Sequence, residues 1–231
     1  MTIRDFSEIA EKTCCIIPMY NEEQVIVDVI TNLKSFFPHV LCIDDGSSDK
    51  SALLAEKAGA QLIRHAVNIG QGASLATGFQ WVQQNKKFLY MVTFDADGQH
   101  RPEDACKLVI ELDNKGLDVV FASRFFEHTQ STVPIMKRLV LRTVTRLNNT
   151  LTGSHLSDAH NGLRALTVEA SKSINITQNG MAHATQFVSL VLQSNLKYTE
   201  LPVTVLYTTY SRSKGQSLMN SINIALDLIW E

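Results

Sequence analysis

The sequence predicts an α/β protein: a doubly wound, mostly parallel sheet with flanking helices and an amphipathic helix at the C-terminus. Short apolar runs that fit buried strands alternate with segments whose apolar residues recur every three or four positions, as in helices. Three expected strands end in loops rich in Asp, Asn, Gly and Ser, and open α/β sheets bind ligands at that edge. No internal repeat, low-complexity tract or linker divides the chain, so we expect one domain over residues 1–231.

The composition limits the function classes. The 231 residues are enough for a large α/β core, and 45% hydrophobic with 19% charged residues is ordinary for a globular protein. A net charge of -2 gives no overall attraction to nucleic acid, so we expect no such partner. The first residues lack the apolar stretch of a signal peptide, and no run approaches the roughly 18 apolar residues of a membrane span. The four cysteines form no Cys-x-x-Cys pair, which indicates reduced, buried thiols in a cytoplasmic protein.

Strands and helices alternate along the first half of the chain. The expected strands cover residues 13–19, 40–43, 61–65, 88–94 and 117–122, and the expected helices cover 22–36, 49–58, a segment ending near 84, and 102–114. Asp49 suits the N-cap of its helix and Gly59 suits its end. Pro102 suits the first turn of a helix. This alternation favours parallel strands joined by helical crossovers.

The stretch from Phe88 to Pro102 is the most informative. An apolar run ends abruptly at Asp95 and Asp97, as expected where a buried strand reaches the ligand-binding edge. Two carboxylates on one tight turn are hard oxygen donors, which Mg²⁺ and Mn²⁺ prefer together with substrate phosphates. Asp97 and the amide oxygen of Gln99 could hold such a metal ion. The alternative is an acidic turn that is only solvated.

The second half opens with a basic segment. The expected helix at 134–150 places Arg138, Arg142 and Arg146 four residues apart, so they share one face. No acidic residue occurs between Glu127 and Asp158. Such a face suits an anionic acceptor or an anionic membrane surface. A solvated basic face is the alternative.

The remaining elements are shorter. We expect a strand at 162–167 followed by a short helix, a helix within 180–195, and an edge strand at 198–207, since Pro202 is tolerated at an edge. A polar loop at 210–217 precedes a final helix that Ser217 caps. That helix is too short to span a bilayer, so it packs on the body, lies on a membrane or contacts a partner.

Missing motifs exclude some enzymes. The first strand is followed neither by Gly-x-Gly-x-x-Gly nor by a P-loop, which argues against dinucleotide oxidoreductases and P-loop NTPases. A sugar-phosphate nucleotidyltransferase would need a basic, glycine-rich loop there, and the segment from Pro18 to Glu22 is neither.

The ordered motifs resemble those of family 2 glycosyltransferases with the GT-A fold, a Rossmann-like sheet. The resemblance covers residues 13–217 and is greatest to the branch of dolichyl- and polyprenyl-phosphate sugar transferases. It rests on Pro18-Met-Tyr20-Asn21-Glu22, Asp44-Asp45-Gly46-Ser47-Ser48-Asp49, Asn68-Ile-Gly70-Gln-Gly72-Ala73, Asp95-Ala-Asp97-Gly98-Gln99-His100, Ser123-Arg124-Phe125, Asp158 with Gly162-Leu-Arg164, Glu200-Leu-Pro202-Val203 and Lys214-Gly215-Gln-Ser217.

The resemblance implies a role for each motif. Residues 1–125 would form the nucleotide-sugar-binding half and 126–231 the acceptor-binding half. The donor site would contain Pro18, Tyr20, Glu22, Asp45, Gly72, Asp95, Ala96, Asp97, Arg212 and Lys214. Asp97 and Gln99 would hold Mg²⁺ or Mn²⁺ at the diphosphate. Arg124 and Arg138 would hold the acceptor phosphate.

The implied reaction inverts the anomeric centre by direct displacement, with Asp97, Asp158 and Arg124 as its catalytic residues. A phosphate acceptor scarcely needs a base, whereas a sugar hydroxyl needs one. Asp158 is the candidate base or acceptor-positioning carboxylate, and its alternative role is to cap the turn at Asn161. A non-catalytic nucleotide-sugar-binding protein is a further alternative, against which the retained carboxylates Asp95 and Asp97 argue.

Two departures leave the acceptor open. Relatives often have an acidic residue after Gly180, where this chain offers only His183 or Gln186. Relatives also often carry membrane spans after this domain, so we expect peripheral binding to the inner face of the membrane, a membrane partner protein, or a soluble acceptor. The expected reaction moves a sugar from GDP-mannose or a UDP-hexose to polyprenyl or dolichyl phosphate. The alternative acceptor is a sugar hydroxyl in cell-surface polysaccharide biosynthesis, and a homodimer is left open.

Overall fold

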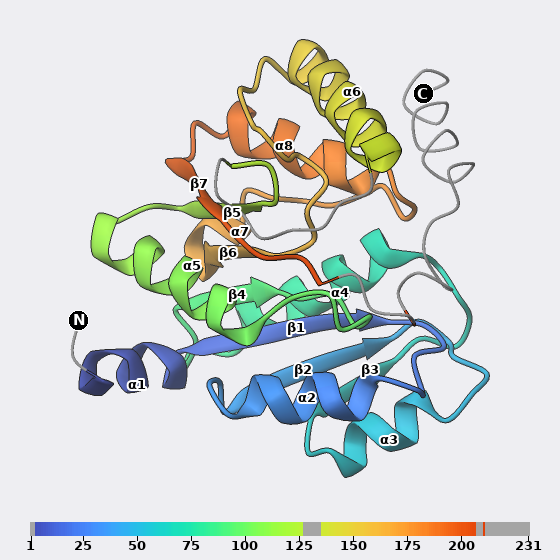
Figure 1. Cartoon of the computed structure of the whole chain (residues 1–231). Helices are drawn as coiled ribbons and strands as arrows, with labels where there is room; N and C mark the ends of the chain where they lie inside the picture. Colours follow the sequence, from blue (N-terminus) through green and yellow to red (C-terminus); the bar gives the residue numbers. More distant parts are fainter. Residues whose placement is uncertain (1–2, 127–134, 207–209, 211–231) are drawn as a thin grey trace.

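The computed structural model describes residues 3–126, 135–206 and 210. Within them, one seven-stranded sheet has the order β3-β2-β1-β4-β6-β5-β7, with helices packed on both faces (Figure 1). Its strands are Thr13–Met19 (β1), His39–Asp44 (β2), Gln61–Arg64 (β3), Tyr90–Thr93 (β4), Val119–Ser123 (β5), Arg164–Thr167 (β6) and Tyr198–Pro202 (β7). The expected α/β class with a mostly parallel sheet is confirmed.

One strand reverses the parallel pattern. β6 pairs antiparallel with both β4 and β5, whereas the other described neighbours are parallel. In this register Thr93, the last residue of β4, lies opposite Arg164, the first residue of β6. The reversal therefore carries Arg164 to the edge where β4 ends, next to the Asp-x-Asp turn.

The helices largely follow the expected pattern. They are Ile3–Glu11 (α1), Ile26–Lys34 (α2), Ser51–Lys57 (α3), Gln71–Gln84 (α4), Pro102–Lys115 (α5), Ile135–Thr152 (α6), Val168–Ser171 (α7) and His183–Gln193 (α8). Pro102 opens α5 as expected, but α1 was not expected. The N-cap position falls on Lys50, one residue later than expected, but the Asp49 carboxylate accepts the N–H of Ser51, the first residue of α3. The same carboxylate also accepts hydrogen bonds from the Ser51 hydroxyl and from the backbone N–H of Glu23.

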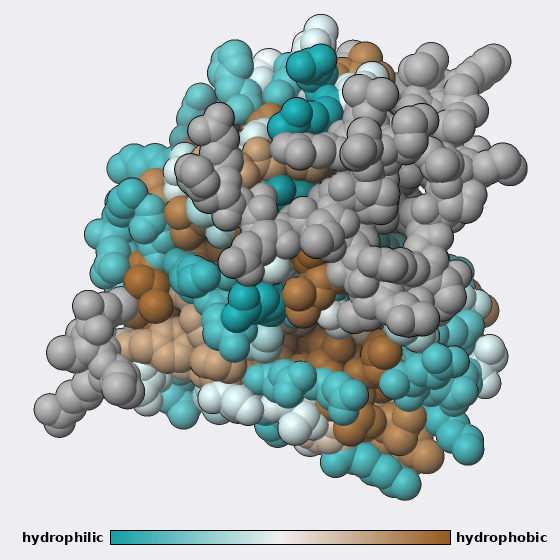
Figure 2. Space-filling model, viewed as in Figure 1, coloured by the Kyte–Doolittle hydropathy of each residue, from teal (hydrophilic) through white to brown (hydrophobic). Residues whose placement is uncertain are grey.

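Two apolar layers hold the sheet between its helices. One layer packs α1, α2 and α5 against one face of the strands, and the other packs α4 and α8 against the opposite face. All four cysteines are buried and free, as expected. Hydrophobic residues lie at the surface near α2 and α3 (Figure 2), and Val27 and Leu53 are exposed.

Several expectations fall outside the described part of the chain. These are the C-terminal helix capped by Ser217, the loop residues Arg212 and Lys214, and the side chain of Arg138, whose backbone lies in α6. Among the residues that are described, no helix combines the length and the apolar character needed to cross a membrane.

Candidate functional site

A cavity of about 440 Å³ opens at the carboxyl edge of β1, β2 and β4. Its wall contains many of the residues that the sequence predicts: Pro18, Tyr20, Glu22, Asp45, Asp95, Ala96, Asp97, Gln99 and Arg124. Loops that are far apart in sequence meet here because parallel strands bring their carboxyl ends to one edge. Gly72 and Asp158 are not in the lining but lie directly behind it.

The loops after β1 and β2 are tied together at the end of the cavity that Tyr20 and Glu22 line. The backbone N–H of Asn21 donates to Ser47 Oγ at 2.9 Å, and the Ser48 N–H donates to Asn21 Oδ1 at 2.9 Å. The Glu22 carboxylate accepts a hydrogen bond from the hydroxyl of Tyr210 at 2.6 Å. These contacts fix the loops against each other.

Asp45 organises the next loop of the wall. Its carboxylate accepts N–H bonds from Ile69 at 3.0 Å and Gly70 at 2.7 Å, and it lies 2.8 Å from His65 Nδ1. Burial raises the pKa of Asp45, but the bonds from Ile69, His65 and Gly70 outweigh burial and hold that pKa below its ordinary value. Asp45 is therefore a charged anchor for the segment that leads into α4.

The Asp-x-Asp turn places two carboxylates in different surroundings. Asp95 Oδ2 accepts a hydrogen bond from His100 Nε2 at 2.9 Å. Burial raises the pKa of Asp95, but His100, Arg164 and Arg124 together lower it below the ordinary value. Burial is the larger cause and the charge of Asp95 the smaller one, and together they raise the pKa of Asp97 to about 6. His100 and the Gln99 N–H thus compensate the negative charge of Asp97 only in part.

That excess charge fits a divalent cation. The Gln99 backbone N–H donates to Asp97 Oδ1 at 3.0 Å, and both residues line the cavity. Within the described residues, no group of three His, Cys, Asp or Glu side chains could hold a metal ion by itself. One carboxylate and an amide oxygen suit Mg²⁺ or Mn²⁺ when substrate phosphates and water complete the coordination.

Arg124 faces this acidic turn from the end of β5. Its Nε donates to Asp158 Oδ2 at 2.6 Å, and its backbone N–H donates to the same oxygen at 3.1 Å. Asp158 is 1% exposed. The structure therefore places Asp158 behind the cavity wall, where it fixes Arg124, and Asn161 Nδ2 lies 3.4 Å from the same carboxylate oxygen.

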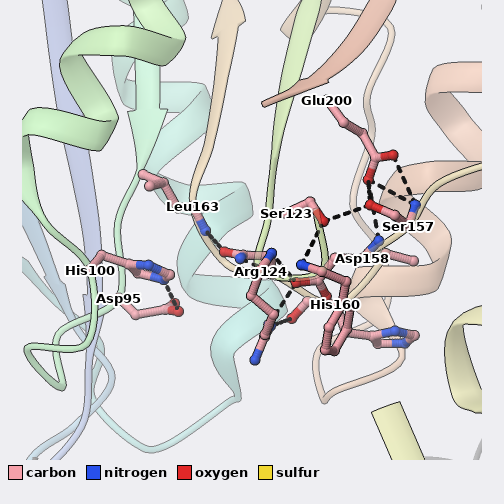
Figure 3. A network of polar contacts seen from close by, with 12 residues as sticks. Asp95, His100, Ser123, Arg124, Ser157, Asp158, His160, Leu163 and Glu200 are labelled. Carbon is pink, nitrogen blue, oxygen red and sulfur yellow. Dashed lines mark hydrogen bonds and ion pairs between the residues drawn. The ribbon is translucent and has the colours of Figure 1, made fainter. Parts of the chain in front are cut away.

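Glu200 on β7 supports this arrangement from behind. Its carboxylate accepts hydrogen bonds from the backbone of Ser157 and Asp158, and Ser157 Oγ lies 2.6 Å from Ser123 Oγ (Figure 3). Burial raises the pKa of Glu200, although these hydrogen bonds act in the opposite direction. The contacts connect β7, the loop before β6 and the end of β5, and so hold Arg124 in place.

Sequence reasoning assigned no role to the buried Arg164, which also lines the cavity. The residue is 2% exposed, and its guanidinium lies 4.4 Å from the centre of the Phe187 ring and donates to the Ala159 carbonyl at 3.4 Å. A single arginine at the start of an apolar strand was the available signal. Gly162 also belongs here, because a Cβ on it would lie 2.3 Å from the Asp95 carboxylate. Its missing side chain lets β6 approach the Asp-x-Asp turn.

Comparison with known proteins identifies the class. A model of glycosyl transferase family 2 matches residues 14–174. An uncharacterized protein of Methanocaldococcus jannaschii is 32% identical over 94% of this chain and 90% of its own length. UDP-N-acetylglucosamine–dolichyl-phosphate N-acetylglucosaminyltransferase of Methanococcus voltae is 27% identical over 93% of each chain. Polyprenol monophosphomannose synthase of Mycolicibacterium smegmatis is 27% identical over 93% of this chain and 83% of its own.

Solved structures show the same architecture. Glucosyl-3-phosphoglycerate synthase from Mycobacterium tuberculosis, in complex with Mn²⁺, UDP-glucose and phosphoglyceric acid, superposes with a TM-score of 0.74. The alignment covers 99% of this chain and 83% of that one at 18% identity, so it shows the fold alone. The fold is the GT-A fold of glycosyltransferases. The chain belongs to glycosyl transferase family 2 and is an enzyme of that family, as the resemblance predicted.

Proposed function

We propose that this enzyme is a metal-dependent inverting glycosyltransferase that moves a sugar from a nucleotide diphosphate sugar to a polyprenyl phosphate. The observation that carries the proposal is the charge arrangement of the cavity, which is lined by the carboxylates of Asp95 and Asp97 and by Arg124 and Arg164, whose charges act on Asp95. A carboxylate turn suits a metal-bound diphosphate, and a separate cation suits a second phosphate. Relatives of nearly full length whose names include dolichyl phosphate and polyprenol support the acceptor.

The donor would lie along the carboxyl edge of the sheet. Pro18, Tyr20 and Glu22 would contact the nucleoside, and Asp45 would hold the loop beneath it. Asp97 and Gln99 would hold Mg²⁺ or Mn²⁺, which stabilises the charge that develops on the leaving diphosphate. The donor sugar is a hexose of a UDP or GDP donor. This part of the proposal rests on the carboxylates of one turn.

The acceptor would approach from the side of β5. Arg124 would orient the acceptor phosphate, and Asp158 would keep the guanidinium aimed by its buried ion pair. A phosphate oxygen is already a nucleophile at neutral pH and needs no general base. The placement of Asp158 behind Arg124 therefore supports a positioning role for this carboxylate rather than proton abstraction. Arg138 remains a proposed second contact to the acceptor.

A transfer assay tests the proposal. UDP-glucose, UDP-N-acetylglucosamine and GDP-mannose would each be incubated with the enzyme and Mn²⁺ or Mg²⁺, with and without a short-chain polyprenyl phosphate. We expect labelled sugar from one donor to enter the organic phase only when the lipid phosphate and the metal are both present. Transfer to an oligosaccharide with no lipid product would instead support a sugar-hydroxyl acceptor and refute the proposed one.

A further inference from the structure

His183 opens α8 and lines the cavity, although it is only 4% exposed. Its Nδ1 lies 2.8 Å from the carbonyl oxygen of Gly180. A carbonyl oxygen only accepts, so Nδ1 must carry the proton that is donated, and Nε2 of the neutral ring keeps its lone pair. No other hydrogen bond of this ring is found among the described residues. The ring therefore offers the cavity a hydrogen-bond acceptor.

The ring is also kept neutral and fixed. Burial and then the charge of Arg164 lower the pKa of His183 to about 4, so the ring is uncharged at neutral pH. Helix α4 packs closely against the histidine at Gly72. A Cβ on Gly72 would lie 2.8 Å from His183 Cβ and 1.9 Å from the carbonyl oxygen of Gln178. The Gly72 N–H donates to the Asn179 carbonyl at 2.8 Å. The histidine is thus held between α4 and the turn that precedes α8.

The position of His183 indicates which part of the donor it meets. Along the sheet order β2-β1-β4-β6, the nucleoside-side residues follow β1 and β2, the Asp-x-Asp turn follows β4, and Arg164 begins β6. His183 lies close enough to Arg164 for the charge of Arg164 to lower its pKa, and both residues line the same cavity as the Asp-x-Asp turn. A donor whose diphosphate lies at Asp97 would place its nucleoside toward β2 and its sugar toward this pair. The lone pair of a neutral imidazole nitrogen does not attract a phosphate oxygen, but it accepts a hydrogen bond from an O–H group.

We propose that His183 Nε2 accepts a hydrogen bond from a hydroxyl group of the transferred sugar and thereby selects the donor. The inference rests on the proposed function, because it needs a nucleotide sugar in this cavity. Arg164 lies beside the histidine and supplies hydrogen-bond donors to the same region. A site built to bind a hydroxyl group discriminates strongly against an analogue that lacks it, because the buried partner is then left unpaired.

Calorimetric titration of donors and free nucleotides tests this role without needing the acceptor. The ligands are UDP-glucose, UDP-N-acetylglucosamine, GDP-mannose, UDP and GDP with Mn²⁺, followed by the monodeoxy analogues of the donor that binds best. We expect His183→Leu to weaken binding of that donor about 10- to 100-fold. Binding of its free nucleotide should be unchanged, and His183→Gln, which keeps an acceptor, should recover part of the loss. One monodeoxy donor should bind wild type and His183→Leu equally.

The control variant is His155→Leu, the same substitution at an exposed position outside the cavity lining, and it should bind every ligand as wild type does. A variant that binds the free nucleotide as wild type does is folded. If His183→Leu does not fold, His183→Gln and the monodeoxy donors test the inference in its place. Wild-type donor affinity in both His183 variants would overturn this inference but not the proposed function. Absence of donor binding by the wild-type enzyme would overturn the proposed function itself.

Discussion

Asp97 is the residue on which the proposed metal dependence rests. Replacing it with asparagine keeps its size but removes the charge that would bind Mn²⁺ or Mg²⁺. We expect Asp97→Asn to lower the metal-dependent affinity for the nucleotide donor roughly 100-fold while the fold is kept, because the cation loses the carboxylate that is proposed to bind it. Calorimetry with UDP or GDP, with and without Mn²⁺, measures this effect.

The matched control is Asp113→Asn, which alters an exposed carboxylate of α5 that accepts a hydrogen bond from Tyr90 at the opposite edge of the sheet. It should leave metal-dependent binding unchanged. Equal affinity in Asp97→Asn and wild type would contradict the metal assignment.

Asp158 and Arg124 form the buried ion pair of the site, with side chains 1% and 10% exposed. Removing one partner of such a pair leaves the other charge without compensation, at a cost of roughly 3–5 kcal/mol. We expect Asp158→Asn to lower the free energy of unfolding by about 3 kcal/mol. If Asp158 positions Arg124, the same variant raises the KM for the acceptor more than the Kd for the donor. Urea unfolding and acceptor titration measure the two effects.

A double-mutant cycle with Arg124→Gln distinguishes positioning from an independent role. If Asp158 acts through Arg124, the two substitutions together should cost clearly less than the sum of the single costs. Additive effects on acceptor use would contradict this positioning role, because they would mean that Asp158 contributes independently of Arg124.

At the scale of elements, α4 and α8 meet through a glycine. A Cβ on Gly72 would lie 1.9 Å from the Gln178 carbonyl oxygen, which is backbone and cannot turn aside. We expect Gly72→Ala to lower the free energy of unfolding by about 1–3 kcal/mol, in line with overpacking, and to weaken donor binding by displacing His183. Gly180→Ala is the matched control, because a Cβ there would meet no atom within 4 Å. Thermal unfolding with donor titration compares them, and equal stability of the two variants would contradict the packing argument.

Elements with strong local signals could be predicted from the sequence, whereas their pairing directions could not. The apolar run before Asp95 and the proline that opens α5 located β4 and its helix. The antiparallel direction of β6 depends on a long connection through α6, which no local pattern encodes. The helix α1 was missed although its spacing was readable: Phe6 packs edge-on against Phe37 with ring centres 5.7 Å apart.

The residues of the site could be predicted where their polar side chains lie in a loop that follows a strand. Asp97 and Glu22 follow strands directly, so their position at the carboxyl edge follows from the fold class. Arg164 and His183 were harder to predict, because each lies within or at the start of an apolar element and reaches the cavity only through tertiary packing. A lone charged or titratable residue in an apolar element is thus a signal whose meaning depends on the neighbours that the fold supplies.

At the scale of the whole molecule, two histidines of the cavity wall, His160 and His183, should make stability depend on pH. Burial lowers the pKa of His160 and of His183 from 6.5 to about 4. Between pH 6.5 and 4 the unfolded chain therefore binds protons that the folded chain does not, and stability falls as pH falls through this window. Each histidine contributes up to about 3 kcal/mol at the lower end, since one pKa unit corresponds to about 1.4 kcal/mol. Asp97, whose pKa is raised to about 6, acts in the opposite direction and offsets part of the loss.

Urea unfolding at pH 7, 6, 5 and 4.5 measures the window, and His160→Gln with His183→Gln isolates the histidine contribution. The double variant starts from lower stability at pH 7, because it replaces two packed rings, but we expect its stability to fall by several kcal/mol less than that of wild type between pH 7 and 4.5. His155→Gln, at an exposed position, should keep the wild-type pH dependence. A double variant that loses as much stability as wild type would mean that the folded protein does not lower the pKa of these two histidines, and would contradict the pH dependence expected from their burial.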